Sequence, residues 1–176
     1  ETIVVGVANV DRKRDFTFHT DLKDLQKDYP TTGHSDKFIA FLEKELKPYV
    51  ESQFKTTDKY LFGQSLGGLL ATEILLKKPE MFNNYFIISP SLWWDDESLL
   101  KQAPQLLTKI KDTKKFIYIS VGKGEHPVMV KDAEDLYDVL KKSNKKNWTV
   151  YYKMMETDNH ATILHRSLYE GLLKLF

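Results

Sequence analysis

Cysteine is absent from the sequence, and so are long apolar runs and an excess of charge of either sign. Without cysteine, the chain has no disulfide scaffold, no cysteine-based zinc site and no thiol nucleophile. Lys and Arg number 26 against 25 Asp and Glu, a formal net charge of +1, so the charge favours neither nucleic acid nor an anionic membrane as a partner. No apolar run approaches the roughly 18 residues that cross a bilayer.

The residues that are present suit one ordinary domain. The chain has 176 residues, of which 41% are hydrophobic and 29% are charged, enough for a buried core under a charged surface. It opens on Glu1, without an initiator Met or a signal-like segment. We therefore expect that an upstream segment was removed or left out. The sequence leaves open the oligomeric state and the compartment, whether periplasmic, secreted or cytoplasmic.

Strand-like and helix-like segments alternate along almost the whole chain. Short, β-branched apolar runs predict strands at 3–8, 59–62, 85–89, 116–121 and 148–155. Helices are predicted over 35–53, 66–78, within 97–111, over 128–143 and up to residue 175, whereas the polar stretch 9–33 is predicted to be a long loop. This alternation predicts right-handed crossovers and an α/β fold, with a mainly parallel sheet and helices on both faces.

The most informative stretch is 63–68, with the letters GQSLGG, which lies between a predicted strand and a predicted helix. It matches G-x-S-x-G, the sharp strand-to-helix turn that exposes a nucleophilic serine. Glycines relieve collisions at such a turn, and the helix start offers free N–H groups to a developing oxyanion. We therefore predict Ser65 to be the nucleophile of a serine hydrolase.

Two later loops supply partners for Ser65. Glu125 follows the strand 116–121, and His160 follows the strand 148–155. The carboxyl ends of parallel strands meet at one edge of a sheet, and Ser, acid, His is the chain order of α/β-hydrolases. In such a triad the histidine takes the proton of the serine, while the carboxylate orients the imidazole.

Rivals remain open for both partners. Two other carboxylates could replace Glu125 and two other histidines could replace His160: Asp132, Asp158, His165 and His126. Glu125 and His160 are preferred because they lie in the loops themselves, whereas Asp132 and His165 are predicted to lie inside helices. No metal site and no cofactor are expected, because these histidines have no carboxylate-rich cluster around them.

The loop 89–96, with the letters SPSLWWDD, permits two interpretations. Trp93 and Trp94 could form an aromatic wall for a substrate, with Asp95 and Asp96 as polar tips. Alternatively, the tryptophans pack in the core and one of the aspartates caps the next helix. The sequence does not decide between them.

A loop of opposite charges, 9–16, follows the first predicted strand. One interpretation is a self-paired surface cluster. We favour the other, in which Asn9, Arg12 and Arg14 lie at the rim of the site and an arginine faces a polar group of the substrate, because this loop also leaves the carboxyl end of a predicted strand.

The chain resembles the esterase D-type esterases, which include siderophore-ester hydrolases, feruloyl esterases and S-formylglutathione hydrolase, and more distantly mycolyltransferases. The segments that carry the resemblance are IVVGVANVDRKRDFT, FGQSLGGLLA, ISPSLWWDD, SVGKGE and DNHAT. The resemblance implies an α/β-hydrolase fold with Ser65, Glu125 and His160 as the triad. It further implies that the Leu66 N–H is an oxyanion donor, and that Trp93 and the loop 9–15 border the site.

This chain departs from the family at two places. Gln64, kept here as a candidate substrate-binding residue, stands where the family more often has His. The family also has further strands before 3–8, one of them between that strand and the Ser65 strand, followed by a loop that supplies a second oxyanion N–H. The expected activity is hydrolysis of a small-molecule ester, with feruloyl or catecholate siderophore esters as candidates. Acyl transfer and a non-catalytic binding module remain the alternatives.

Overall fold

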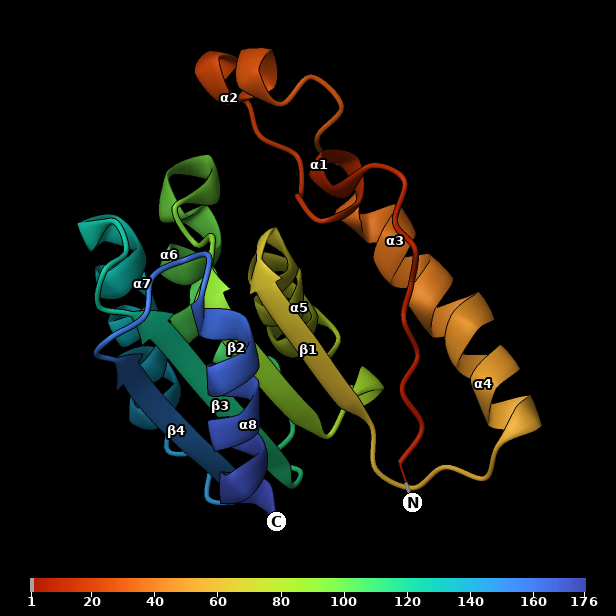
Figure 1. Cartoon of the computed structure of the whole chain (residues 1–176). Coiled ribbons are helices and arrows are strands. Elements are labelled where there is room, and N and C mark those ends of the chain that lie inside the picture. The colour runs from red at the N-terminus through yellow and green to blue at the C-terminus, as the bar shows by residue number, and fades with distance from the viewer. Residues whose placement is uncertain (1) are drawn as a thin grey trace.

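The computed structural model describes residues 2–176 and contains one parallel sheet with helices on both faces (Figure 1). The four strands lie in chain order, and each neighbouring pair is parallel. They are β1 (Tyr60–Ser65), β2 (Asn84–Pro90), β3 (Lys115–Gly122) and β4 (Trp148–Met155). β2 and β3 are buried throughout, as their continuous apolar runs predict for a sheet covered on both faces. The predicted α/β class and parallel sheet are confirmed.

Alternate residues of the strands enter different cores. Tyr85 and Ile87 of β2 belong to the larger core, together with residues of α5 (Leu66–Lys77), α6 (Trp94–Lys109) and α7 (Pro127–Lys142). Phe86, between them, packs with leucines of α8 (Ile163–Leu175) on the opposite face. A short 3₁₀ turn, η2 (Pro79–Met81), leads into β2. Among the described helices, none has the length and apolar character needed to cross a membrane.

The N-terminal third lies beside this unit. It contains α1 (Arg12–Asp15), α2 (Lys23–Asp28) and one long helical rod made of α3 (Ser35–Phe41), the π-helical stretch η1 (Leu42–Leu46) and α4 (Lys47–Gln53). The predicted helix over 35–53 is therefore confirmed. The predicted loop 9–33 contains two short helices instead of irregular chain alone.

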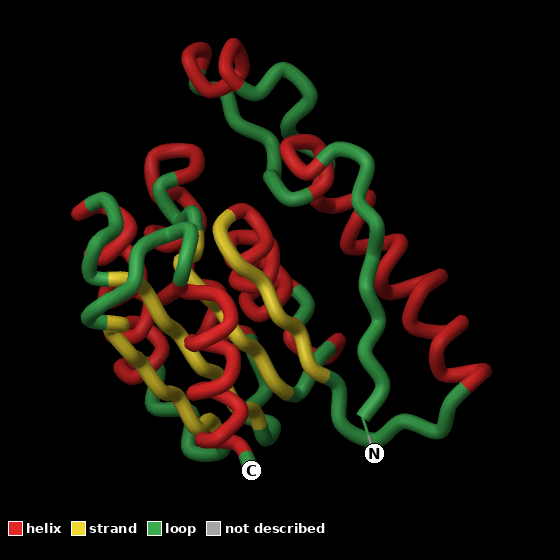
Figure 2. The backbone as a smooth tube through the Cα atoms, in the orientation of Figure 1, coloured by secondary structure: helices red, strands yellow, loops and turns green. Residues whose placement is uncertain are grey.

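The predicted strand at 3–8 is wrong. Residues 2–8 form no strand and run alongside the α3–α4 rod (Figures 1 and 2). Val4 is 89% exposed, and within the described residues the edge strand β1 pairs only with β2. A β-branched run favours an extended backbone, but a strand also needs a neighbour with which to exchange hydrogen bonds. Within residues 2–176 this segment has no such neighbour.

Candidate active site

Ser65 lies at the sharp turn between β1 and α5, with φ 60° and ψ −123°, a strained backbone conformation for a residue other than glycine. The turn brings the chain close to itself. A Cβ on Gly63 would lie 2.0 Å from the carbonyl oxygen of Gly67, and one on Gly68 would lie 2.9 Å from Pro90 Cα. Gly67 itself has open space around it. Packing thus requires glycine at position 63, as predicted, and also at position 68, whereas the predicted collision at Gly67 is wrong.

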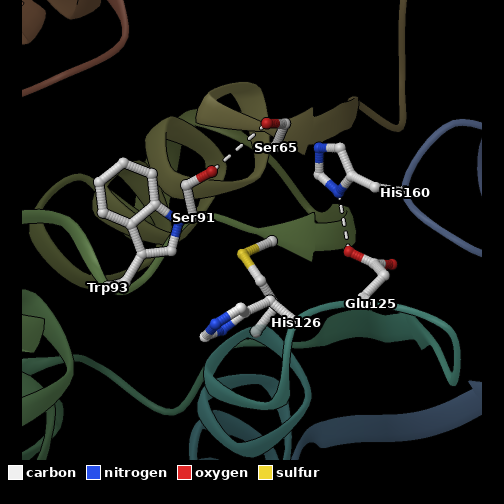
Figure 3. Close-up of a pocket in the computed structure, with 7 residues that line it drawn as sticks. Ser65, Ser91, Trp93, Glu125, His126 and His160 are labelled. Atoms are coloured by element: carbon white, nitrogen blue, oxygen red, sulfur yellow. Dashed lines mark hydrogen bonds and ion pairs between the residues drawn. The ribbon is translucent and has the colours of Figure 1, made fainter.

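A cavity of about 210 Å³ opens in front of Ser65. Its lining comes from the carboxyl ends of the strands and from the loops and helix that follow them (Figure 3). The lining residues are Ser65, Ser91, Trp93, Glu125, His126, Met129 and His160. The structure therefore places the predicted nucleophile, acid and base around one pocket, at the edge of the sheet where parallel α/β folds bind ligands.

His160 and Glu125 form a direct pair, with 2.7 Å between Nδ1 and Oε2. The carboxylate is buried, at 1% side-chain exposure, whereas the imidazole is 47% exposed. The other oxygen of Glu125 accepts hydrogen bonds from the Ser89 hydroxyl at 2.5 Å and from the Gly122 N–H at 2.8 Å. Both carboxylate oxygens are therefore held, and the imidazole lies between Glu125 and Ser65 (Figure 3).

Backbone contacts bring the acid loop and the histidine loop together. The Gly124 N–H donates to the Asp158 carbonyl at 3.0 Å, and a Cβ on Gly122 would lie 2.6 Å from that same oxygen. From the nucleophile turn, the Gln64 side-chain amide donates to the backbone carbonyl of His160 at 2.7 Å. Gln64 thus ties the turn to the histidine loop, and it is not among the residues that line the pocket.

The rival residues have other surroundings. The Asp158 carboxylate accepts hydrogen bonds from Thr162 and Arg166. Asp132 is fully buried on α7, and neither of its carboxylate oxygens has a hydrogen-bond partner in the described part of the chain. Burial, reinforced by the nearby charge of Glu97, raises the pKa of Asp132 to about 6. In the part of the chain that the structure describes, neither of these two carboxylates bonds to an imidazole.

The two rival histidines lie within a helix or at the start of one. His165 lies inside α8, as predicted. His126 is the N-cap of α7, where its Nδ1 accepts a hydrogen bond from the Val128 N–H at 3.3 Å. It also lines the pocket, beside Met129. Of the histidines within residues 2–176, His160 is the one that pairs with Glu125.

The Ser65 hydroxyl contacts Ser91 and does not cap the helix that follows it. Ser65 is the N-cap residue of α5, but its side chain makes no capping hydrogen bond. Its oxygen lies 3.4 Å from the Ser91 oxygen, and within the described residues no hydrogen bond joins it to His160. Leu66 begins α5, so its N–H belongs to the first turn, where N–H groups have no partner within the helix.

The two tryptophans of the loop 89–96 have different roles. Trp93 lines the pocket, as an aromatic wall would. Trp94 is fully buried, and its indole N–H donates to the Phe18 carbonyl at 3.0 Å. Trp94 thus packs in the core and does not line the pocket, whereas a contact between Trp93 and a substrate stays a prediction.

Charged and polar side chains of the loop 9–16 pair with one another. The Arg14 guanidinium donates to Asp15 at 2.7 Å, which raises the pKa of Arg14, and the Asn9 side-chain amide donates to the same carboxylate at 2.7 Å. Arg12 lies over the Phe16 ring, 5.8 Å from its centroid. Asn9, Arg12 and Arg14 do not line the Ser65 pocket. Their contact with a substrate therefore stays a prediction.

A second cavity, of about 380 Å³, lies between α1 and α3. Its lining combines cationic groups, one carboxylate and two phenyl rings: Arg14, Asp15, His34, Lys37, Phe38 and Phe41. Arg14 therefore lines this second cavity and not the Ser65 pocket. Among the described residues, no group of three or more His, Cys, Asp or Glu side chains is arranged to hold a metal ion.

Sequence reasoning gave no role in this site to Ser89, Ser91 or Met129, and it named His126 only as a rival for the base. Ser91 follows the carboxyl end of β2, next to the nucleophile strand, so the rule that ligands collect at the carboxyl ends of strands could have indicated it. Ser89 has a positive φ of 43°, and its hydroxyl reaches a loop 36 residues further along the chain. No local pattern in the sequence indicates such a contact.

Comparison with known proteins decides the family. The model of the family described as "Putative esterase" matches residues 1–166. The chain belongs to this esterase family. Ferri-bacillibactin esterase BesA of Bacillus subtilis is 30% identical over 165 residues, which are 87% of this chain and 57% of BesA. The chain thus spans little more than half the length of this curated relative.

Two solved structures have a similar fold. The BES protein from Bacillus cereus superposes with a TM-score of 0.83 at 34% identity, over 96% of this chain and 65% of the other. An IroE-like serine hydrolase from Shewanella oneidensis gives a TM-score of 0.84 at 28% identity, over 96% of this chain and 57% of the other. The four-stranded unit and its flanking helices therefore have the arrangement of an α/β serine hydrolase.

Proposed function

We propose that the chain hydrolyses carboxylic esters, with Ser65 as nucleophile, His160 as general base and acid, and Glu125 as the carboxylate that orients the imidazole. The observation that carries this proposal is the 2.7 Å contact between His160 Nδ1 and the buried Glu125 carboxylate, in the pocket that Ser65 also lines. A carboxylate on Nδ1 fixes the tautomer whose Nε2 is free to take a proton.

The chemistry is an acyl transfer to Ser65 followed by hydrolysis. The Ser65 hydroxyl turns from Ser91 toward His160, and its oxygen attacks the ester carbonyl carbon while its proton passes to Nε2. The Leu66 N–H donates to the oxyanion that forms. The ester C–O bond then breaks, and His160 returns the proton to the departing alcohol. Water, activated by His160, releases the acid from Ser65.

Siderophore esters are the substrate class that we propose. BesA is a ferri-bacillibactin esterase by name, and a second relative, from Aspergillus fumigatus, is a siderophore triacetylfusarinine C esterase. In this chain Trp93 offers an indole surface beside Ser65, which suits an aromatic acyl group such as a catecholate or a feruloyl group. No cofactor is needed for this chemistry.

Labelling with a fluorophosphonate probe, followed by peptide mass spectrometry, tests the proposal. We expect an adduct on Ser65 that is lost in Ser65→Ala and in His160→Ala. Ser91→Ala is the matched control, because Ser91 lines the same pocket and should leave the Ser65 adduct in place. Turnover of a catecholate siderophore triester, a feruloyl ester and p-nitrophenyl acetate then defines the substrate. A folded wild-type chain that neither takes the label nor hydrolyses these esters would refute the proposed function and favour a binding module.

A further inference from the structure

A segment of the N-terminal third packs against the turn that carries Trp93. This segment comprises residues 17–32, includes α2, and is called the 17–32 segment below. In Figure 1 it lies beyond the start of α6, at the top of the view. Among the residues that line the Ser65 pocket, none belongs to it. It can therefore influence the pocket only through residues that it contacts.

The first contact is aromatic. The Tyr29 ring centroid lies 6.2 Å from that of Trp93 and 5.2 Å from that of Trp94, which it meets edge-on at 80°. The two indoles are 6.1 Å apart, so the three rings form one cluster. Trp94 is fixed in this cluster by burial and by its hydrogen bond to the Phe18 carbonyl. Trp93 thus touches Tyr29 and also lines the pocket.

The second contact is polar and holds a strained turn. Asp95, Asp96 and Glu97 have φ values of 53°, 52° and 57°, three consecutive left-handed residues without a glycine. Such a turn persists only where neighbouring groups hold it. The hydroxyl of Thr20, a buried residue of the 17–32 segment, donates to Asp95 Oδ1 at 2.6 Å. The Ser98 hydroxyl donates to the other oxygen of Asp95 at 2.6 Å.

We infer that Tyr29 and Thr20 are positioning residues that hold the Trp93 indole against the Ser65 pocket and thereby set its preference for bulky aromatic esters. Tyr29 supports the indole, and Thr20 maintains the left-handed turn that follows it. If either support is lost, the turn relaxes and Trp93 leaves the pocket wall. A small acetyl ester needs no such wall. The selectivity part of this inference rests on the proposed function, whereas the placement of Trp93 does not.

Four variants in the full chain separate positioning from folding. Tyr29→Leu removes the aromatic support, and Thr20→Val removes the hydroxyl while it keeps the side-chain volume. Tyr29→Phe and Thr20→Ser keep the ring and the hydroxyl and should restore wild-type behaviour. Lys27→Ala is the matched control, because Lys27 is an exposed residue of α2 in the same segment. Circular dichroism confirms that each variant is folded.

Two measurements decide the outcome. Hydroxyl-radical footprinting with tandem mass spectrometry reports how accessible Trp93 is, without any requirement for activity. We expect Trp93 to become more reactive in Tyr29→Leu and Thr20→Val alone. In these variants kcat/KM for a feruloyl ester should fall about ten-fold through a higher KM, while kcat for p-nitrophenyl acetate stays near wild type.

The two hypotheses fail in different ways. Unchanged Trp93 reactivity in both Tyr29→Leu and Thr20→Val would overturn the inference, and so would an equal loss of turnover with both esters. A wild-type chain that hydrolyses neither ester would refute the proposed function instead. The footprint would still show whether the 17–32 segment holds Trp93.

Discussion

Ser89 shows how much of the site depends on single residues outside the triad. Its hydroxyl donates to Glu125 at 2.5 Å from a fully buried position. Ser89→Ala leaves that carboxylate oxygen with only the Gly122 N–H. We expect kcat to fall about ten-fold, because a lost hydrogen bond to a charged group costs about 1.5–3 kcal/mol and part of that cost falls on the orientation of His160. Steady-state ester hydrolysis measures this effect.

The matched control is Ser120→Ala. Ser120 is also fully buried, on the neighbouring strand β3, and its hydroxyl pairs with that of Ser167 on α8, away from the pocket. The Ser120→Ala substitution should lower the free energy of unfolding without changing kcat. Equal kcat values for Ser89→Ala and wild type would show that Ser89 does not position the carboxylate.

At the scale of residues, chain order and the ends of strands carry enough information to predict which side chains come together, while the catalytic roles of these side chains stay predictions. Ser65 ends β1, and Glu125 and His160 follow β3 and β4, so the topology alone predicts that they approach one another. The contacts of Ser89 and Gln64 depend on the distance between loops that are far apart in the sequence, and that distance is set by packing. This is why neither contact could be predicted.

At the scale of elements, α7 contains a buried carboxyl group, Asp132, whose effect on the free energy of unfolding depends on pH. The pKa of Asp132 is raised from 3.8 to about 6, first by burial and then by Glu97. The folded chain therefore holds this proton more tightly than the unfolded chain, and unfolding becomes easier as the pH rises through about 6. Asp132→Asn carries no charge at any pH. Relative to wild type, it should gain stability on the order of 1–2 kcal/mol between about pH 4 and about pH 8.

Urea denaturation of both proteins at these two pH values checks this prediction. A constant difference between them at all pH values would contradict it, since an offset alone reflects packing of the amide. The same variant should retain ester turnover, because Asp132 makes no contact with His160. Loss of turnover would make Asp132 a rival for the catalytic acid again.

Elements could be predicted where burial controls the pattern. The strand at 148–155 was predicted with its observed bounds, and the other three strands of the sheet to within a few residues, because buried strands are continuous apolar runs between polar loops. The run at 3–8 has the same composition but no hydrogen-bonding neighbour among the described residues. Composition favours an extended backbone, whereas pairing depends on the rest of the molecule.

At the scale of the whole molecule, the main feature is the edge of the sheet along β1, where no further strand is paired within the described residues. Among residues 2–176, β1 pairs only with β2. Phe62 on β1 is 44% exposed and stacks on Phe86, with 4.5 Å between the ring centroids. An unpaired strand edge beside exposed apolar side chains is a template for another chain.

We therefore expect the 176-residue chain to self-associate with rising concentration in sedimentation velocity. Phe62→Lys should weaken this association, because an edge lysine must lose its water when a second strand pairs there. Tyr169→Lys on α8, at 64% exposure, is the matched apolar-to-lysine control and should leave the association unchanged. If both variants dissociate the chain equally, general surface charge is the cause and the β1 edge is not the interface.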